Sequence, residues 1–147
     1  MVSQIERGES SPTVATLWNL TQALQVDFAG LMEGRPDPGI EVTHAAAAPV
    51  MMRGEGVRIR ILSPAEAVGE HEVYDVSFAP GARLVSDAHS SGCREHLTVI
   101  EGVLRVRSGE DTALLNAGDV ARYAADRAHE IAADGGAARA ILIVQGS

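Results

Sequence analysis

The sequence has few aromatic residues and a single cysteine. Aromatic residues make up 3% of its 147 positions, too few to favour the stacking platforms that bind single-stranded nucleic acid. Cys93 has no second cysteine with which to form an internal disulfide, which is typical of a protein kept in a reducing cytoplasm.

Basic residues and long apolar runs are also scarce. Lys and Arg number 12 against 20 Asp and Glu, so the formal net charge is -8, which argues against strong non-specific affinity for DNA. The longest apolar runs, such as residues 141–144, are far too short to cross a bilayer. The first residues are polar rather than signal-like. We therefore expect a soluble, cytoplasmic protein with no membrane partner.

Helical periodicity is confined to residues 1–33. Apolar residues recur there with spacings of three, three and four at Val14, Leu17, Leu20 and Leu24, which indicates one face of an amphipathic helix. The sequence therefore predicts a short α-helical segment at the N-terminus. Residues 34–50 contain three prolines and no sustained period, which is typical of a linker.

The rest of the chain, residues 51–147, has the pattern of short strands separated by turns. Apolar and polar residues alternate over residues 57–61 and 104–107. Residues 138–144 indicate a closing strand that is buried on both faces. Eight or nine such strands predict a mainly β fold, a small double-sheet jelly roll.

Residues 80–102 combine the features expected of a binding site. Side chains of a strand alternate between its two faces, so Asp87 and His89 are predicted to share one face. By the same rule Glu95 shares a face with Leu97, and His96 points away. A histidine and a carboxylate would then face each other inside an apolar shell.

This stretch resembles the first motif of the cupins, which supplies a glycine, an H-x-H pair, a glutamate and a second glycine. Gly81, His89, Glu95 and Gly102 match it, although the His89 to Glu95 interval is one residue longer. Asp87 stands where the first histidine of the pair is expected. The resemblance implies a cupin-type double-stranded β-helix.

The second cupin motif is met in part by Gly118 and His129, without the family's proline, inner glycine and closing asparagine. The resemblance implies a divalent metal, Zn, Mn, Fe or Ni, held by His89, Glu95 and His129 with Asp87 as a fourth ligand. The alternative is that His89 and Glu95 hydrogen-bond each other in a polar pocket without metal. Tyr123 is a further candidate for contact with a bound ligand, or is ordinary barrel lining.

Residues 3–24 are similar to the second half of the XRE-type, or lambda-repressor-like, helix-turn-helix domain. The resemblance implies DNA contacts at Ser3, Gln4 and Arg7. The first two helices of that domain would precede Met1, so either Met1 lies inside a longer reading frame or the segment is a remnant. We expect DNA binding only if the helix-turn-helix is completed.

The segment from His89 to Glu95 also follows the H-x-P-G-x-x-E version of the motif in XRE regulators that carry a cupin domain. The resemblance therefore implies a ligand-sensing cupin of a transcriptional regulator and not an enzyme. Such a protein would bind a small molecule, form a homodimer and modulate DNA binding. Two alternatives stay open: a metal-dependent cupin dioxygenase or isomerase, and a stand-alone binding cupin.

Overall fold

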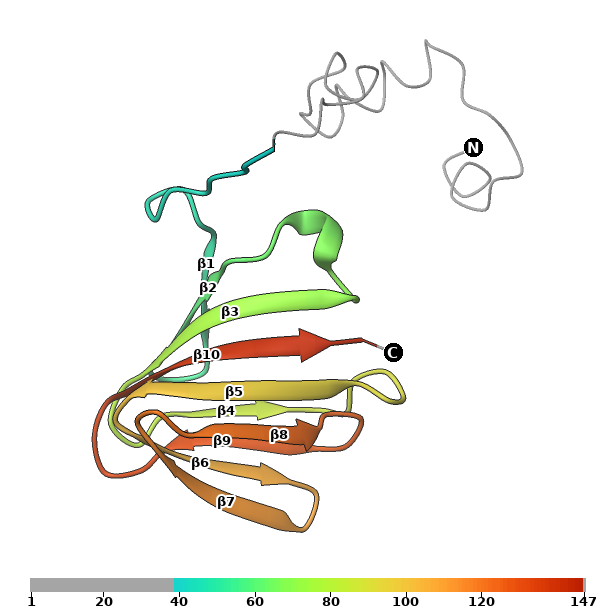
Figure 1. The fold of residues 1–147 in the computed structure, drawn as a ribbon. Helices are drawn as coiled ribbons and strands as arrows, with labels where there is room; N and C mark the ends of the chain where they lie inside the picture. The colour runs from blue at the N-terminus through green and yellow to red at the C-terminus, as the bar shows by residue number, and fades with distance from the viewer. Residues whose placement is uncertain (1–38, 147) are drawn as a thin grey trace. The chain divides into compact units, whose positions relative to one another are not determined.

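Two antiparallel β-sheets make up the part of the chain that the computed structural model describes, residues 39–146 (Figure 1). The six-stranded sheet has the order β1 (Val50–Arg53), β2 (Val57–Ile61), β3 (His71–Phe78), β10 (Ala138–Gln145), β5 (Arg94–Glu101) and β8 (Val120–Ala124). The four-stranded sheet has the order β4 (Arg83–Ser86), β9 (His129–Ala133), β6 (Val103–Ser108) and β7 (Asp111–Asn116). The predicted mainly β jelly roll is thereby confirmed.

Within residues 39–146 the helical content is one 3-10 turn, η1 (Ala65–Ala67). No helix in this described range is long and apolar enough to cross a membrane. The predicted helical segment over residues 1–33, with Ser3, Gln4 and Arg7, lies outside the described residues. The strands begin at Val50, and the compact unit that contains them begins at Thr43; the predicted division into residues 1–33, 34–50 and 51–147 stays a prediction.

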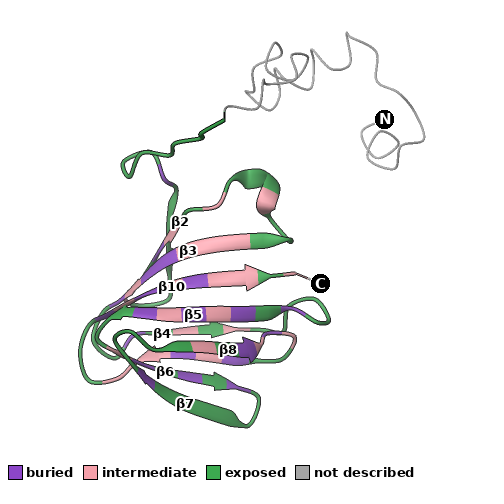
Figure 2. Cartoon of the chain, in the orientation of Figure 1, coloured by how far each residue is buried: buried purple, intermediate pink, exposed green. Residues whose placement is uncertain are grey.

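The hydrophobic core lies between the inner faces of the two sheets (Figure 2). Its largest fully buried side chains are Leu97, Leu104, Ile131, Val57, Val76 and Val99. Most come from strands with alternating burial, because successive side chains of a strand point to opposite faces; Val76 is the exception, since its neighbour Asp75 on β3 is also buried. Burying one such side chain contributes about 1.5 to 3 kcal/mol, so the alternation that the sequence shows is what fixes the register of the sheets.

Strand β10 occupies an interior position in the six-stranded sheet. It pairs with β3 over its whole length, from Ala138 opposite Phe78 to Gln145 opposite His71, and on its other side with β5. From Ala138 to Ile143 its residues alternate between buried and half-buried, and the strand ends on the exposed Gln145. The expectation that this strand is buried on both faces is therefore wrong: only the inner face packs in the core, and the outer face keeps part of its surface in solvent.

On the outer face of the same sheet, Asp75 is nearly buried at 6% exposure between two arginines. Arg139 donates two hydrogen bonds of 2.9 Å to its carboxylate, and Arg60 donates one of 2.6 Å. The hydrogen bonds from Arg139 hold the pKa of Asp75 below its usual range; burial opposes this effect and Arg60 reinforces it. The arrangement joins β2, β3 and β10 across the face opposite to the core.

We expect the Asp75→Asn substitution to lower the free energy of unfolding by about 1 kcal/mol near neutral pH, since both arginines keep part of their surface in water. Because the pKa of Asp75 is lower in the folded than in the unfolded state, its contribution is present above the unfolded pKa and is lost as the pH falls through the folded value. Urea unfolding of both proteins between pH 7 and pH 2 measures this, and the difference should shrink with acidification. The exposed Asp87→Asn serves as control; equal pH dependence in all three proteins would contradict the prediction.

Candidate metal and ligand site

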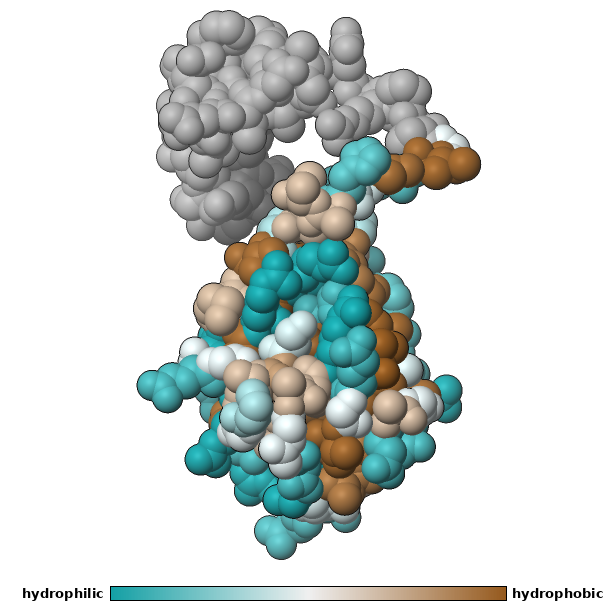
Figure 3. All heavy atoms as spheres, turned by 90° about the vertical axis from the view of Figure 1, so that its left-hand side faces the viewer, coloured by the Kyte–Doolittle hydropathy of each residue, from teal (hydrophilic) through white to brown (hydrophobic). Residues whose placement is uncertain are grey.

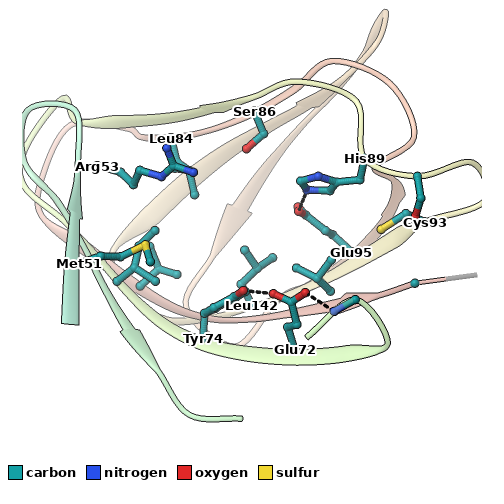
Figure 4. A pocket seen from close by; sticks show the side chains of 16 residues that line it. Met51, Arg53, Glu72, Tyr74, Leu84, Ser86, His89, Cys93, Glu95 and Leu142 are labelled. Carbon is teal, nitrogen blue, oxygen red and sulfur yellow. Dashed lines mark hydrogen bonds and ion pairs between the residues drawn. The ribbon is translucent and has the colours of Figure 1, made fainter. Parts of the chain in front are cut away.

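A cavity of about 370 Å³ opens between the two sheets (Figure 4). Of the predicted site residues, His89 and Glu95 line it, whereas Tyr123 and His129 do not. Its apolar walls come from both sheets: Met51, Ile59, Val76, Leu84, Leu142 and Val144. Polar and charged side chains also reach it: Arg53, Glu72, Tyr74, Ser86, His89, Ser90, Cys93 and Glu95. This combination of apolar walls with a few polar groups is typical of small-molecule sites.

His89 and Glu95, which line the cavity, converge with His129, which does not line it. His89 lies in the segment between β4 and β5, Glu95 is the second residue of β5, and His129 is the first residue of β9. The Nε2 atoms of His89 and His129 lie 3.3 Å and 3.2 Å from the same atom, Oε1 of Glu95. Glu95 and His129 are buried, at 2% and 3% exposure, whereas His89 is exposed at the cavity.

A hydrogen bond to the backbone fixes the orientation of the His129 ring. Its Nδ1 lies 2.8 Å from the carbonyl oxygen of Arg127, an acceptor, so Nδ1 must carry a proton. Its Nε2 then faces a second acceptor, the Glu95 carboxylate. Either Nε2 is protonated too, or its lone pair points at a cation that lies between the two groups. The hydrogen bond to Glu95 accordingly raises the pKa of His129, although burial opposes the shift.

The remaining oxygen of Glu95 accepts a 2.6 Å hydrogen bond from the hydroxyl of Tyr123, which lies opposite Glu95 on β8. Burial alone would raise the pKa of Glu95, but the hydrogen bonds from His129 and Tyr123 outweigh it and hold that pKa below its usual range. Burial and then the charge of Glu95 raise the pKa of Tyr123. Glu95 is therefore a carboxylate and Tyr123 its permanent donor.

The three residues fit a divalent cation. Their ligand atoms all lie within 4.8 Å of one another. Two ligand atoms, each about 2.1 Å from an ion, are about 3.0 to 3.4 Å apart when they are neighbours in octahedral and tetrahedral sites, and both distances from Nε2 to Oε1 fall in that interval. The three atoms together span up to 4.8 Å, so the two imidazoles must move slightly closer to each other to share one ion. Two imidazoles and one carboxylate suit zinc, manganese, iron or nickel. Among the described residues this is the group with metal-ligand geometry.

Asp87 is not brought into this group. It is exposed, and it follows the last residue of β4, Ser86, whose position lines the cavity instead. The prediction that Asp87 and His89 share one face rests on a continuous strand and does not hold, because β4 ends at Ser86. Beyond it the backbone N–H of His89 bonds to the carbonyl of Ala125, 2.9 Å away. The prediction for β5 does hold: Glu95 and Leu97 are buried, and His96 between them is half-buried.

The cavity is also lined by one cysteine and by two charged residues that the sequence did not single out. Cys93 is buried, and burial followed by the negative charge of Glu95 raises the pKa of its thiol, which is the environment of a packing residue. Glu72 and Arg53 were not predicted, although both line the cavity. The alternation of Glu72 with Tyr74 and Val76 could have revealed Glu72; no signal in the sequence marks Arg53.

Comparisons with known proteins agree with this geometry. Residues 74–144 match the family described as Cupin domain. The chain is 35% identical over 129 residues to the HTH-type transcriptional regulator SutR of Escherichia coli (strain K12), covering 88% of this chain and 68% of that protein.

Solved structures agree on the fold. An HTH_3 family transcriptional regulator from Vibrio cholerae superposes with a TM-score of 0.62 at 28% identity, over 100% of this chain and 79% of that one. The protein FeII HppE superposes with a TM-score of 0.65 at 17% identity, over 90% of this chain and 75% of that one. At that identity the second likeness concerns the fold alone.

Proposed function

The chain belongs to the HTH-type transcriptional regulators that carry a cupin domain, and from this premise we propose that its cavity binds a small molecule whose binding modulates the binding of DNA. The observation that carries the proposal is the cavity of about 370 Å³, apolar along its walls and charged at separate positions along its lining. A ligand acts on a second site by binding one of two arrangements of the protein more tightly.

A metal would have a binding role in this proposal. His89, Glu95 and His129 would hold it, and Tyr123 keeps the Glu95 carboxylate oriented through its hydrogen bond. When bound, a divalent ion supplies a Lewis acid for a ligand oxygen or nitrogen. His89 is exposed at the cavity, so a ligand reaches this end of the site without any movement of the buried Glu95.

The DNA partner and the assembly form part of the same proposal. A complete helix-turn-helix supplies the DNA contacts, and two copies of the chain form a homodimer in the cytoplasm. Hydrophobic side chains at the surface support the dimer: Val50 and Met52, on the outer face of β1, are 47% and 63% exposed. Figure 3 shows hydrophobic residues beside hydrophilic ones on one face of the described part of the chain.

The triad also favours a second candidate, a metal-dependent dioxygenase or isomerase, since two histidines and one carboxylate with open positions are the ligands of non-haem iron enzymes. The relatives at 35% and 28% identity are transcriptional regulators by name, which favours the non-enzymatic role. Chemical conversion of the bound molecule by the metal-loaded protein would show that the protein is an enzyme and not only a binding protein.

A cavity-blocking variant tests the proposed function. Leu84→Trp places a larger side chain in the cavity, and Leu114→Trp, at an exposed position of β7, is the matched control. We expect one fraction of a metabolite extract to raise the melting temperature of the wild type and of Leu114→Trp by at least about 2 °C, and not that of Leu84→Trp.

The same fraction should change the affinity of the complete regulator for its operator about 5-fold or more, measured by fluorescence anisotropy. Either of two results would refute the proposal: no fraction that stabilises the wild type, or a stabilising fraction that leaves DNA affinity unchanged.

A further inference from the structure

Glu72 supplies a fixed negative charge to the cavity wall, apart from the metal-ligand group. The backbone N–H of Gly69 donates a 2.7 Å hydrogen bond to its Oε1, and the hydroxyl of Tyr74 donates to its Oε2. Burial, and then the hydrogen bond to Glu72, raise the pKa of Tyr74, so Tyr74 stays a donor. Within residues 39–146 no cationic side chain pairs with Glu72.

Arg53 supplies a positive charge to the same cavity. It is the last residue of β1 and lies in register with Val57 of β2, which in turn faces Phe78 of β3. Val57 and Phe78 are buried, so Arg53 is on the inner face of the sheet. No carboxylate in the described part of the chain forms an ion pair with it.

The two charges are far apart along the cavity. Arg53 is level with Phe78, and Glu72 lies six residues earlier on β3, which is roughly 20 Å between backbone positions at about 3.3 Å per residue. Their long side chains shorten this gap. Figure 4 shows Arg53 beside Met51 at one side of the cavity, with Tyr74 and Leu142 between it and Glu72. The surface between the charges is largely apolar: Val76, Leu84 and Leu142.

Among the described residues, this cavity wall carries two opposite, separated charges without an ion-pair partner, and such a wall is complementary to a molecule with the reverse pattern. We infer that the ligand is a small zwitterion with an ammonium group held by Glu72, a carboxylate held by Arg53 and an apolar chain between them. This rests on the proposed small-molecule site and names the class of molecule that it takes. The two hydrogen bonds on Glu72 orient its carboxylate before the ligand binds, which reduces the cost of ordering it.

The probes that test this are ω-amino acids from 4-aminobutanoate to 8-aminooctanoate, compared with hexanoate and hexylamine by calorimetric titration. We expect at least one ω-amino acid to bind the wild type about 10-fold or more tightly than both single-charge compounds. Glu72→Gln should lower the affinity for that ω-amino acid about 10-fold. Arg53→Gln should remove about 3-fold, because Arg53 is exposed and water screens its charge.

Glu70→Gln is the matched control, since Glu70 is exposed and does not line the cavity. Equal affinity for hexanoate or hexylamine and the zwitterions would overturn the inference without any variant, as would a folded Glu72→Gln that binds as the wild type does. If no probe binds while a metabolite fraction stabilises the wild type and not Leu84→Trp, the inference is wrong and the proposed function stands. If that fraction also fails, both are wrong.

Discussion

Replacing Glu95 with glutamine is expected to lower the affinity for a divalent metal on the order of 100-fold or more. The amide keeps the size of the side chain but removes the negative charge that both imidazoles face at 3.2 Å and 3.3 Å. A neutral amide oxygen is a much poorer ligand than a carboxylate for zinc, manganese, iron or nickel. Competition with a chromophoric chelator measures the loss for each metal.

Tyr123→Phe is the graded control for this experiment. It leaves all three ligand side chains in place and removes only the hydrogen bond of 2.6 Å to the second carboxylate oxygen of Glu95. Groups that orient a ligand are typically worth about 10- to 100-fold in metal affinity, so this variant should lie between Glu95→Gln and the wild type. A Glu95→Gln protein that binds metal as tightly as the wild type would show that the triad is not a metal site.

The second large effect is expected at Gly102, which joins β5 to β6. Its φ of 77° lies in the left-handed region, and a Cβ there would meet the carbonyl oxygen of Ala137 at 2.4 Å and two atoms of Ala138 at 2.9 Å. The backbone of β10 must shift to admit it. We expect Gly102→Ala to lower the free energy of unfolding by about 3 kcal/mol or more, measured by urea denaturation.

Gly81→Ala separates the two causes of that loss. Gly81 has nearly the same φ, 74°, but a Cβ there would have nothing within 4 Å. It should cost only the backbone strain, about 1 kcal/mol. Equal losses in the two variants would show that the contact with residues 137 and 138 carries no penalty.

The fold followed from the sequence because its strands carry a local signal. Glu95 and Leu97 alternate with more exposed neighbours in the structure as they do in the sequence, since a half-buried strand needs that pattern at every position. The sequence predicts eight or nine strands, whereas the described residues form ten. Short edge strands such as β1, with four exposed residues, bury too little to leave a pattern.

The site was predictable only in part, for a different reason. His89, Glu95 and His129 carry motif spacings, and the structure brings them together. The prediction that Asp87 shares a face with His89 does not hold, because the alternation of residues cannot reveal where a strand ends. Arg53 was missed because its place in the cavity depends on the pairing of β1 with β2, a contact that no local pattern in the sequence encodes.

The interior position of β10 sets a constraint on how the protein is made. Strands β3 and β5 leave the ribosome first, and each presents an unpaired edge until residues 138–145 emerge and insert between them. Exposed strand edges pair readily with other chains, and non-local pairing is slow. The nascent chain therefore passes through an interval in which aggregation competes with closure of the sheet, and that interval ends only when β10 has emerged and paired with both neighbours.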